Sequence, residues 1–94
     1  MPISVKFIGA LRHLSGKTQV SVNYQKSMKL ENLISQLSQE MPALAKTFSD
    51  QPLGDSKSNS LILVNGREIS VLNGVETELC DGDEVVFVPV VHGG

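Results

Sequence analysis

Apolar and polar residues alternate in two short stretches near the start of the chain. In residues 3–8 the apolar side chains fall on one side, with Ile8 as the exception, and this spacing predicts a strand with one buried face. The alternation returns in residues 17–24, after a loop at 9–16 that begins and ends with glycine. Two neighbouring strands joined in this way predict a β-hairpin.

The period changes to a helical one between residues 28 and 41. Ser27 is the predicted N-cap of this helix, and Pro42 ends or interrupts it. Residues 43–48 predict one further short turn of helix, whereas residues 49–60 are turn formers almost throughout and predict a mobile surface loop. The apolar positions that form one stripe of the helix are Leu30, Leu33, Ile34, Leu37 and Met41.

The second half of the chain carries shorter strand signals. Residues 61–64 are continuously apolar, which predicts a strand buried on both faces or nearly so. Residues 67–71 predict a brief strand, and residues 84–88 predict the last one, which Pro89 closes. The turns between these strands are predicted at Asn65-Gly66, at Asn73-Gly74 and at 78–83.

This order of elements predicts a single α+β domain over residues 1–94, with a mixed sheet of about five strands and one main helix packed across it. A first hairpin, a crossing helix and a returning last strand match the β-grasp (ubiquitin-like) arrangement. By analogy with that fold, the last strand would lie beside the first and parallel to it. Residues 89–94 would then form a flexible tail.

The composition excludes several classes of function. A net charge of −2 without a dense basic run argues against nucleic acid as a direct partner, and one tyrosine and three phenylalanines are too few for a base-stacking platform. No apolar stretch approaches the ~20 residues that span a bilayer, and the N-terminus lacks the layout of a signal peptide. Cys80 is the only cysteine, which agrees with a reducing compartment. We therefore expect a cytoplasmic protein that does not bind membranes.

Three segments within the chain have features of a functional site, but each lacks part of the pattern that its chemistry requires. Gly16-Lys17-Thr18 invites comparison with a phosphate-binding loop, but Leu11 stands where the first glycine should be, and the alternating residues that follow predict a strand instead of a helix. His13 lies in no cluster at metal-ligand spacing. Cys80 lies beside acidic residues, whose negative charge makes a neighbouring thiol a poor nucleophile. We expect no catalytic residue, bound cofactor or metal in this chain.

The chain ends on Gly93-Gly94, directly after an apolar strand. No side chain shields the carboxylate of a terminal glycine, and two glycines can adopt backbone angles that let a tail enter a narrow channel. A frayed terminus would also end in this way, so the two glycines alone leave both interpretations open.

Three motifs give the chain a resemblance to a known family. Residues 81–94, DGDEVVFVPVVHGG, are similar to the ending D-G-D-E-V-x-x-x-P-P-V-x-G-G of the molybdopterin-synthase small subunit and thiamine sulfur-carrier family (MoaD/ThiS). Residues 7–16 resemble its F-A-x-L-R-E-x-x-G motif, and residues 41–44 resemble its Y-P-x-L motif. His13 replaces the usual acid, Val90 replaces the second proline, and the ending His-Gly-Gly is closer to the ubiquitin-related modifiers.

The resemblance implies a carrier that is not itself an enzyme, or the small, non-catalytic subunit of a molybdopterin synthase. An E1-like enzyme would use ATP with magnesium to adenylate the Gly94 carboxylate, and sulfur from a persulfide would displace AMP to leave a thiocarboxylate. The acceptor would be the large subunit of molybdopterin synthase, a tRNA thiolation enzyme, or the thiamine or cysteine pathway. Alternatively, a lysine amine of a target protein would attack the activated glycine, giving a modifier joined by an isopeptide bond. A third possibility is a non-covalent interaction domain.

Partners of such a carrier need a docking surface beside the tail. Ile8, Val86 and Val88 are apolar residues on the sides of their strands opposite to the predicted core. If the first and last strands are neighbours, these residues form one exposed apolar patch, unless a helix or loop covers them. Arg12 would flank the patch as a charged contact. His92 and Gly93 would thread into the partner, and the tail from Pro89 spans at most ~20 Å.

Overall fold

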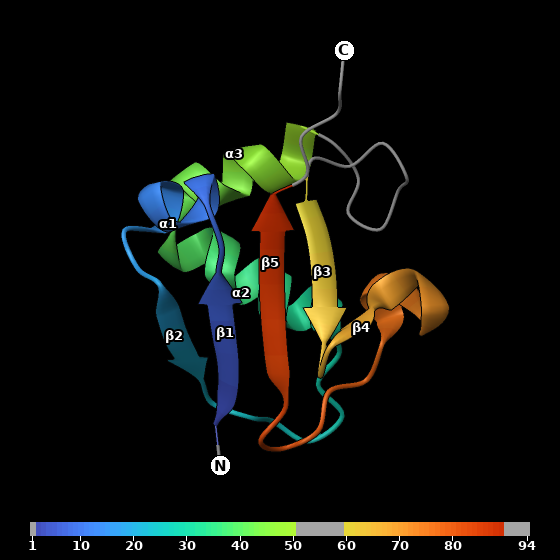
Figure 1. Cartoon of the computed structure of the whole chain (residues 1–94). Helices are drawn as coiled ribbons and strands as arrows, with labels where there is room; N and C mark the ends of the chain where they lie inside the picture. The colour runs from blue at the N-terminus through green and yellow to red at the C-terminus, as the bar shows by residue number, and fades with distance from the viewer. Residues whose placement is uncertain (1, 51–59, 90–94) are drawn as a thin grey trace.

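A mixed sheet with a parallel pair at its centre forms the frame of the molecule (Figure 1). The computed structural model describes residues 2–50 and 60–89. The sheet has five strands in the order β2-β1-β5-β3-β4. β5 runs parallel to β1 and antiparallel to β3, so the predicted central position of the last strand is confirmed. The strands are β1 (Ile3–Phe7), β2 (Gln19–Val22), β3 (Ser60–Val64), β4 (Arg67–Glu68) and β5 (Glu84–Pro89).

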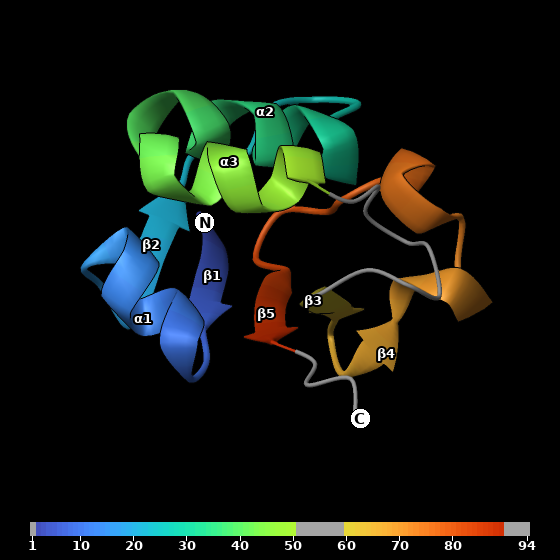
Figure 2. The same cartoon turned by 90° about the horizontal axis from the view of Figure 1, so that it is seen from above.

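Two helices, α2 (Leu30–Glu40) and α3 (Pro42–Asp50), lie over one face of this sheet (Figure 2). The alternation in β1 and β5 sends every second side chain into the space between the sheet and the helices, where the rings of Phe7 and Phe87 stack with centroids 5.8 Å apart. The apolar stripe of α2 closes this core from above. The buried residues of the two strands and of α2 are Ile3, Val5, Phe7, Leu30, Leu33, Leu37, Val85 and Phe87.

The segment predicted as a loop at 9–16 instead contains a short helix, α1 (Ala10–Ser15), so β1 and β2 are antiparallel neighbours without a simple hairpin turn. Gly9 and Gly16 bound this helix, both with positive φ, and Gly16 forms its left-handed C-cap. Leu11, which is 2% exposed, anchors α1 to the core. The glycines that suggested a loop are therefore the two caps of a helix.

The bounds of the main helices also differ from the prediction. Ser27 is not the N-cap, because it adopts φ +63° in a turn before the helix. Lys29 takes that position, and its backbone N–H donates to the Asn32 side-chain oxygen at 2.8 Å. Pro42 does end the first helix, but it also begins a second one of nine residues, because a proline fits the first turn, where its missing N–H is not needed. Of the predicted loop at 49–60, residues 51–59 lie outside the described residues.

The second half departs from the prediction in two places. The brief strand predicted at 67–71 is only β4, and a 3₁₀ turn, η1 (Ile69–Val71), follows it and buries Ile69. In β3 only one face is fully buried: Ile62 and Val64 are 1% and 5% exposed, whereas Leu61 and Leu63 are half-buried on the other face. Beyond β4 and η1 lies one more 3₁₀ turn, η2 (Gly74–Glu76).

Candidate functional site at the carboxyl end of strand β5

The predicted reactive end of the chain continues directly from the central strand. Pro89 is the last residue of β5, and it lies opposite Ser60 in the register with β3. Residues 90–94, which include His92, Gly93 and Gly94, lie outside the described residues. The chain therefore leaves the sheet from its middle strand, β5, which lies between β1 and β3 (Figure 1).

The parallel ladder between β1 and β5 extends to the base of the tail. The N–H of Ile8 donates to the carbonyl oxygen of Phe87 at 3.0 Å, which continues the pairing of Phe7 with Phe87 by one residue. Ile8 therefore follows β1 directly beside the end of β5. Its side chain is 36% exposed, as expected for the one apolar residue on the polar side of that strand.

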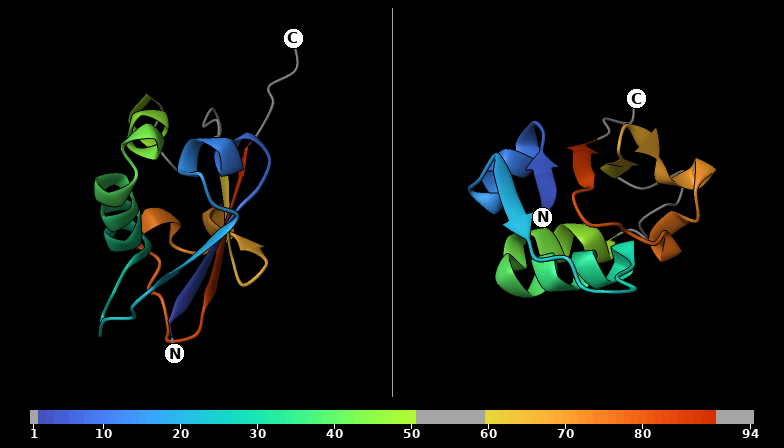
Figure 3. Two further views of the ribbon diagram at one scale, coloured as in Figure 1. Left: turned by 90° about the vertical axis from the view of Figure 1, so that its left-hand side faces the viewer. Right: turned by 90° about the horizontal axis from the view of Figure 1, so that it is seen from below.

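Val86 and Val88 lie on the face of β5 that points away from the helices, and both are half-buried. Leu63 pairs with Val86 and Leu61 with Val88, and directly opposed residues point to the same face of a sheet. In the described part of the chain no helix lies over this face (Figure 3). We call the group that it exposes the outer-face patch: Ile8, Leu61, Leu63, Val86 and Val88.

The sequence alone did not point to Leu61 and Leu63 as members of the patch. Their continuously apolar surroundings indicated a strand buried on both faces, and periodicity does not show which strand lies next to which. Once β3 is placed beside β5, the alternation within 61–64 is sufficient to assign each residue to a face. The placement of Ile8, Val86 and Val88 agrees with the predicted patch, and their part in docking stays a prediction.

Charged side chains lie at two ends of the outer-face patch. At one end, Arg12 of α1 donates from Nε to the carbonyl oxygen of Phe7 at 3.3 Å, which holds the guanidinium near the end of β1 while the residue stays exposed. At the other end, Lys6 Nζ and Glu84 Oε2 form an ion pair at 2.9 Å. The side chains of this pair are each 43% exposed, so water screens much of their attraction. Arg12 thus has a structural contact of its own, and its predicted contact with a partner stays a prediction.

Gly16-Lys17-Thr18 lies between the end of α1 and the start of β2, so these residues open no helix that could hold a phosphate. In the described residues no three His, Cys, Asp or Glu side chains converge as a metal site would require. Cys80 is exposed, and its N–H donates to an Asp83 carboxylate oxygen at 2.7 Å in a turn. Among the same residues, no helix is both long and apolar enough to cross a membrane.

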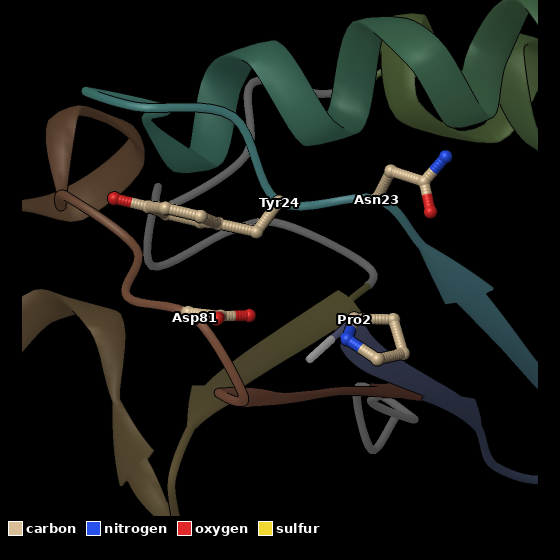
Figure 4. Close-up of a pocket in the computed structure, with 4 residues that line it drawn as sticks. All are labelled: Pro2, Asn23, Tyr24 and Asp81. Carbon is tan, nitrogen blue, oxygen red and sulfur yellow. The ribbon is translucent and has the colours of Figure 1, made fainter.

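A shallow hollow of roughly 400 Å³ lies at the opposite end of the sheet, where β1 and β5 begin (Figure 4). A proline ring, an amide, a phenol and one carboxylate line it, from Pro2, Asn23, Tyr24 and Asp81. None of these four residues carries a positive charge that could bind the phosphates of a nucleotide. It is also separated by the length of the strands from the end where Pro89 lies.

Comparison with known proteins gives consistent matches over the whole chain. The model of the ThiS family matches residues 5–94. The chain is 34% identical over 99 residues to ubiquitin-related modifier 1 of Schizosaccharomyces pombe and 29% identical over 94 residues to small archaeal modifier protein 3 of Haloferax volcanii. Both alignments cover 100% of this chain and 100% of the relative.

A solved structure is also similar, that of small archaeal modifier protein 1 from Methanosarcina acetivorans. Its TM-score is 0.77 at 31% identity, and the match covers 99% of this chain and 96% of that chain. A five-stranded mixed sheet crossed by helices on one face, together with this match, confirms the predicted β-grasp fold.

Proposed function

The chain belongs to the ThiS family of ubiquitin-like sulfur carriers and modifiers, and from that premise we propose that Gly94 is its reactive group. In this proposal an E1-like enzyme activates the Gly94 carboxylate, and the chain then carries sulfur as a C-terminal thiocarboxylate. The observation that supports the proposal best is the attachment of the Gly-Gly ending to the central strand of the sheet, beside the outer-face patch.

The chemistry requires activation because a carboxylate is a poor electrophile. A Gly94 carboxylate oxygen attacks the α-phosphorus of ATP, which the partner holds with magnesium, and pyrophosphate leaves. The terminal sulfur of a persulfide then attacks the carbonyl carbon, and AMP leaves with the bonding electron pair. The product is an acyl disulfide, in which a second thiol of the sulfur donor attacks the donor's own sulfur. That step leaves the thiocarboxylate on Gly94 and a disulfide on the donor.

In this proposal the chain binds the activating enzyme and presents the Gly94 carboxylate to it. The outer-face patch docks on the activating enzyme, and Arg12 adds a charged contact at its edge. Docking through a rigid sheet makes the attack on ATP effectively intramolecular, which raises the local concentration of the carboxylate at the partner's active site. His92 and Gly93 then need only to fit a narrow channel, and glycine places no side chain in the way.

Intact-mass measurement tests the carrier role. The full chain is incubated with the E1-like enzyme of the same organism, ATP, magnesium and a persulfide donor. We expect a gain in mass that equals the exchange of one oxygen for one sulfur, and localisation of this change to Gly94. A chain that lacks Gly93 and Gly94 is the matched control and should gain nothing. An unchanged mass of the complete chain, with an enzyme that is active on ATP, would contradict the proposal.

A second candidate function is protein modification through the same activated glycine. It is favoured by the matches to a ubiquitin-related modifier and to a small archaeal modifier protein, and by the ending His92-Gly93-Gly94. A target lysine amine would attack the adenylate carbonyl carbon, and AMP would leave as the isopeptide bond forms. Cells that express the tagged chain should then yield lysines linked to its C-terminal residues after digestion. If no such linked lysines are found under conditions in which the thiocarboxylate forms, the modifier role is contradicted and only the carrier role remains.

A further inference from the structure

The turn between β1 and α1 contacts the base of the tail. Gly9 occupies this turn, and a Cβ atom added to it would lie 3.0 Å from Cγ and 3.7 Å from Cδ of Pro89. A carbon–carbon contact of 3.0 Å is well inside the ~3.5–4.0 Å of an optimal contact. Gly16 and Gly66 also have positive φ, yet a Cβ atom on either would meet nothing within 4 Å. Gly9 is thus distinguished by a close approach as well as by its backbone angles.

The backbone of Gly9 gives an independent reason for glycine. It adopts φ 60° and ψ −133°, a combination that residues with a Cβ atom rarely reach. Its carbonyl oxygen accepts from the N–H of Arg12 at 3.0 Å, so the first turn of α1 begins from this conformation. The turn is consequently fixed at the point where the proline ring meets it.

Pro89 is the last residue of β5, where the strand lies between β1 and β3. Ser60 of β3 lies opposite it on one side, and on the other side the bond from Ile8 to Phe87 ends the ladder with β1. Pro89 has no N–H, and its ring fixes φ near about −65°. The ring can change its pucker, but it cannot rotate away, since both its ends are bonded to the backbone. A side chain at residue 9 would therefore push on the backbone at the base of the tail.

We infer that Gly9 is a positioning residue for the reaction at Gly94. Its missing side chain lets the Pro89 ring seat against the β1–α1 turn, and this contact sets the direction in which the chain leaves the sheet towards the activating enzyme. Gly9 itself touches neither ATP nor the reacting carboxylate. The inference rests on the proposed function, because it assigns a direction to the same C-terminal group.

The length of the tail explains why a small displacement at its base matters. Five residues beyond Pro89 span at most about 18 Å when fully extended. The shift that a Cβ atom at residue 9 demands is a few tenths of an ångström, but a tilt of only about 5° at the base would already move the end of such a tail by about 1.5 Å, because the end moves in proportion to the length. A misplacement of 1 Å in a reacting group can cost about 100-fold in rate. The glycines can recover part of such an error, so we expect a smaller loss here.

A double-mutant cycle isolates this contact from the backbone strain. The variants are Gly9→Ala, Pro89→Ala and the double variant, and the measurement is ATP–pyrophosphate exchange with the E1-like enzyme, analysed for kcat and for KM of the carrier. Gly9→Ala carries the same strain at residue 9 in both backgrounds, but only Pro89 provides the ring atoms that collide with the new methyl group. The strain cancels in the comparison, and the coupling between the two residues remains.

We expect Gly9→Ala to lower kcat by about tenfold while KM stays within about twofold, because the substitution keeps every side chain of the outer-face patch and changes mainly the direction of the carboxylate. In the Pro89→Ala background the same substitution should lower kcat by less than about threefold. Gly16→Ala, which places a side chain at a positive φ at the other end of α1, controls for destabilisation and should leave kcat unchanged. Melting temperatures of all variants are measured alongside.

Two results would overturn the inference: an equal loss of kcat in both backgrounds, or a loss that follows the melting temperature and appears with Gly16→Ala as well. Both leave the proposed function intact, since the unaltered chain is still activated. If the unaltered chain supports no ATP–pyrophosphate exchange with an active enzyme, the proposed function itself fails. The two failures are therefore distinguishable in one series of measurements.

Discussion

The inner and outer faces of the sheet are made by the same strands, and they differ in what covers them. On the inner face, side chains such as Val85 and Phe87 are fully enclosed by α2, α3 and their neighbours. On the outer face, Val86 and Val88 stay half-buried with no described helix above them. Neighbouring residues of one strand thus differ in their contacts: the inner ones pack in the core and stabilise the fold, and the outer ones are left partly exposed to solvent.

The largest expected effect is on the inner face. Phe87→Ala removes a ring that is 0% exposed and stacked on Phe7, so we expect the free energy of unfolding to fall by about 3–5 kcal/mol. This loss is a large fraction of the total stability, because domains of this size are stable by only about 5–15 kcal/mol. Urea denaturation followed by circular dichroism measures the change. A loss below about 1 kcal/mol would show that this face is not the core.

A sharper comparison uses two neighbours in β3 that point to opposite faces. Ile62 is 1% exposed on the inner face, whereas Leu63 is half-buried on the outer one. Ile62→Ala should lower the free energy of unfolding by about 2–4 kcal/mol, because it leaves a cavity in a closed core. Leu63→Ala should cost about 1 kcal/mol or less, since solvent or neighbouring side chains can fill the space. Equal losses in the same denaturation experiment would contradict the difference between the faces.

Substitutions on the outer face should weaken binding to the activating enzyme more than they lower the free energy of unfolding. Val88→Asp places a charge in the outer-face patch, and we expect KM for activation by the E1-like enzyme to rise about tenfold, which corresponds to ~1.4 kcal/mol. The free energy of unfolding should change by less than about 1 kcal/mol, because Val88 lies outside the closed core. Ser21→Asp is the matched control, since Ser21 is an exposed residue of β2 on the same face but away from the patch. A KM that rises equally with both variants would point to net charge as the cause.

The smallest expected effect concerns the ion pair between Lys6 and Glu84. Both side chains are 43% exposed, so a double-mutant cycle with Lys6→Gln and Glu84→Gln should give a coupling of about 0.2–1 kcal/mol. Raising the salt concentration to about 1 M should reduce it further, because the screening length falls to about 3 Å. A coupling that is unaffected by salt would indicate a more enclosed pair than the outer face provides.

The parts of the fold that the sequence predicted are those set by local periodicity. Ile3, Val5 and Phe7 alternate because β1 has one buried face, and the stripe of Leu30, Leu33 and Leu37 marks a helix for the same reason. A six-residue helix such as α1 is too short to show a period, and the glycines at both its ends resemble loop residues. Its existence depends on the burial of Leu11, which is a tertiary contact.

The candidate site was predictable only in part, for a related reason. The Gly-Gly ending, Ile8, Val86 and Val88 can be read from the chain because they depart from the local pattern. Leu61 and Leu63 join the patch only through the pairing of β3 with β5, and Gly9 gains its contact with Pro89 only through the pairing of β1 with β5. Contacts between distant segments depend on the topology, which alternation within one segment does not reveal.

The central position of β5 also has a mechanical consequence. A partner that draws the tail into a channel pulls on Pro89 along the direction of the strand. The backbone hydrogen bonds that join β5 to β1 on one side and to β3 on the other lie across that direction. They are loaded in shear and must break together, and a central strand has such bonds on both sides, whereas an edge strand has them on one side only. We therefore expect a sheet built in this way to stay closed when a partner pulls on the chain beyond Pro89.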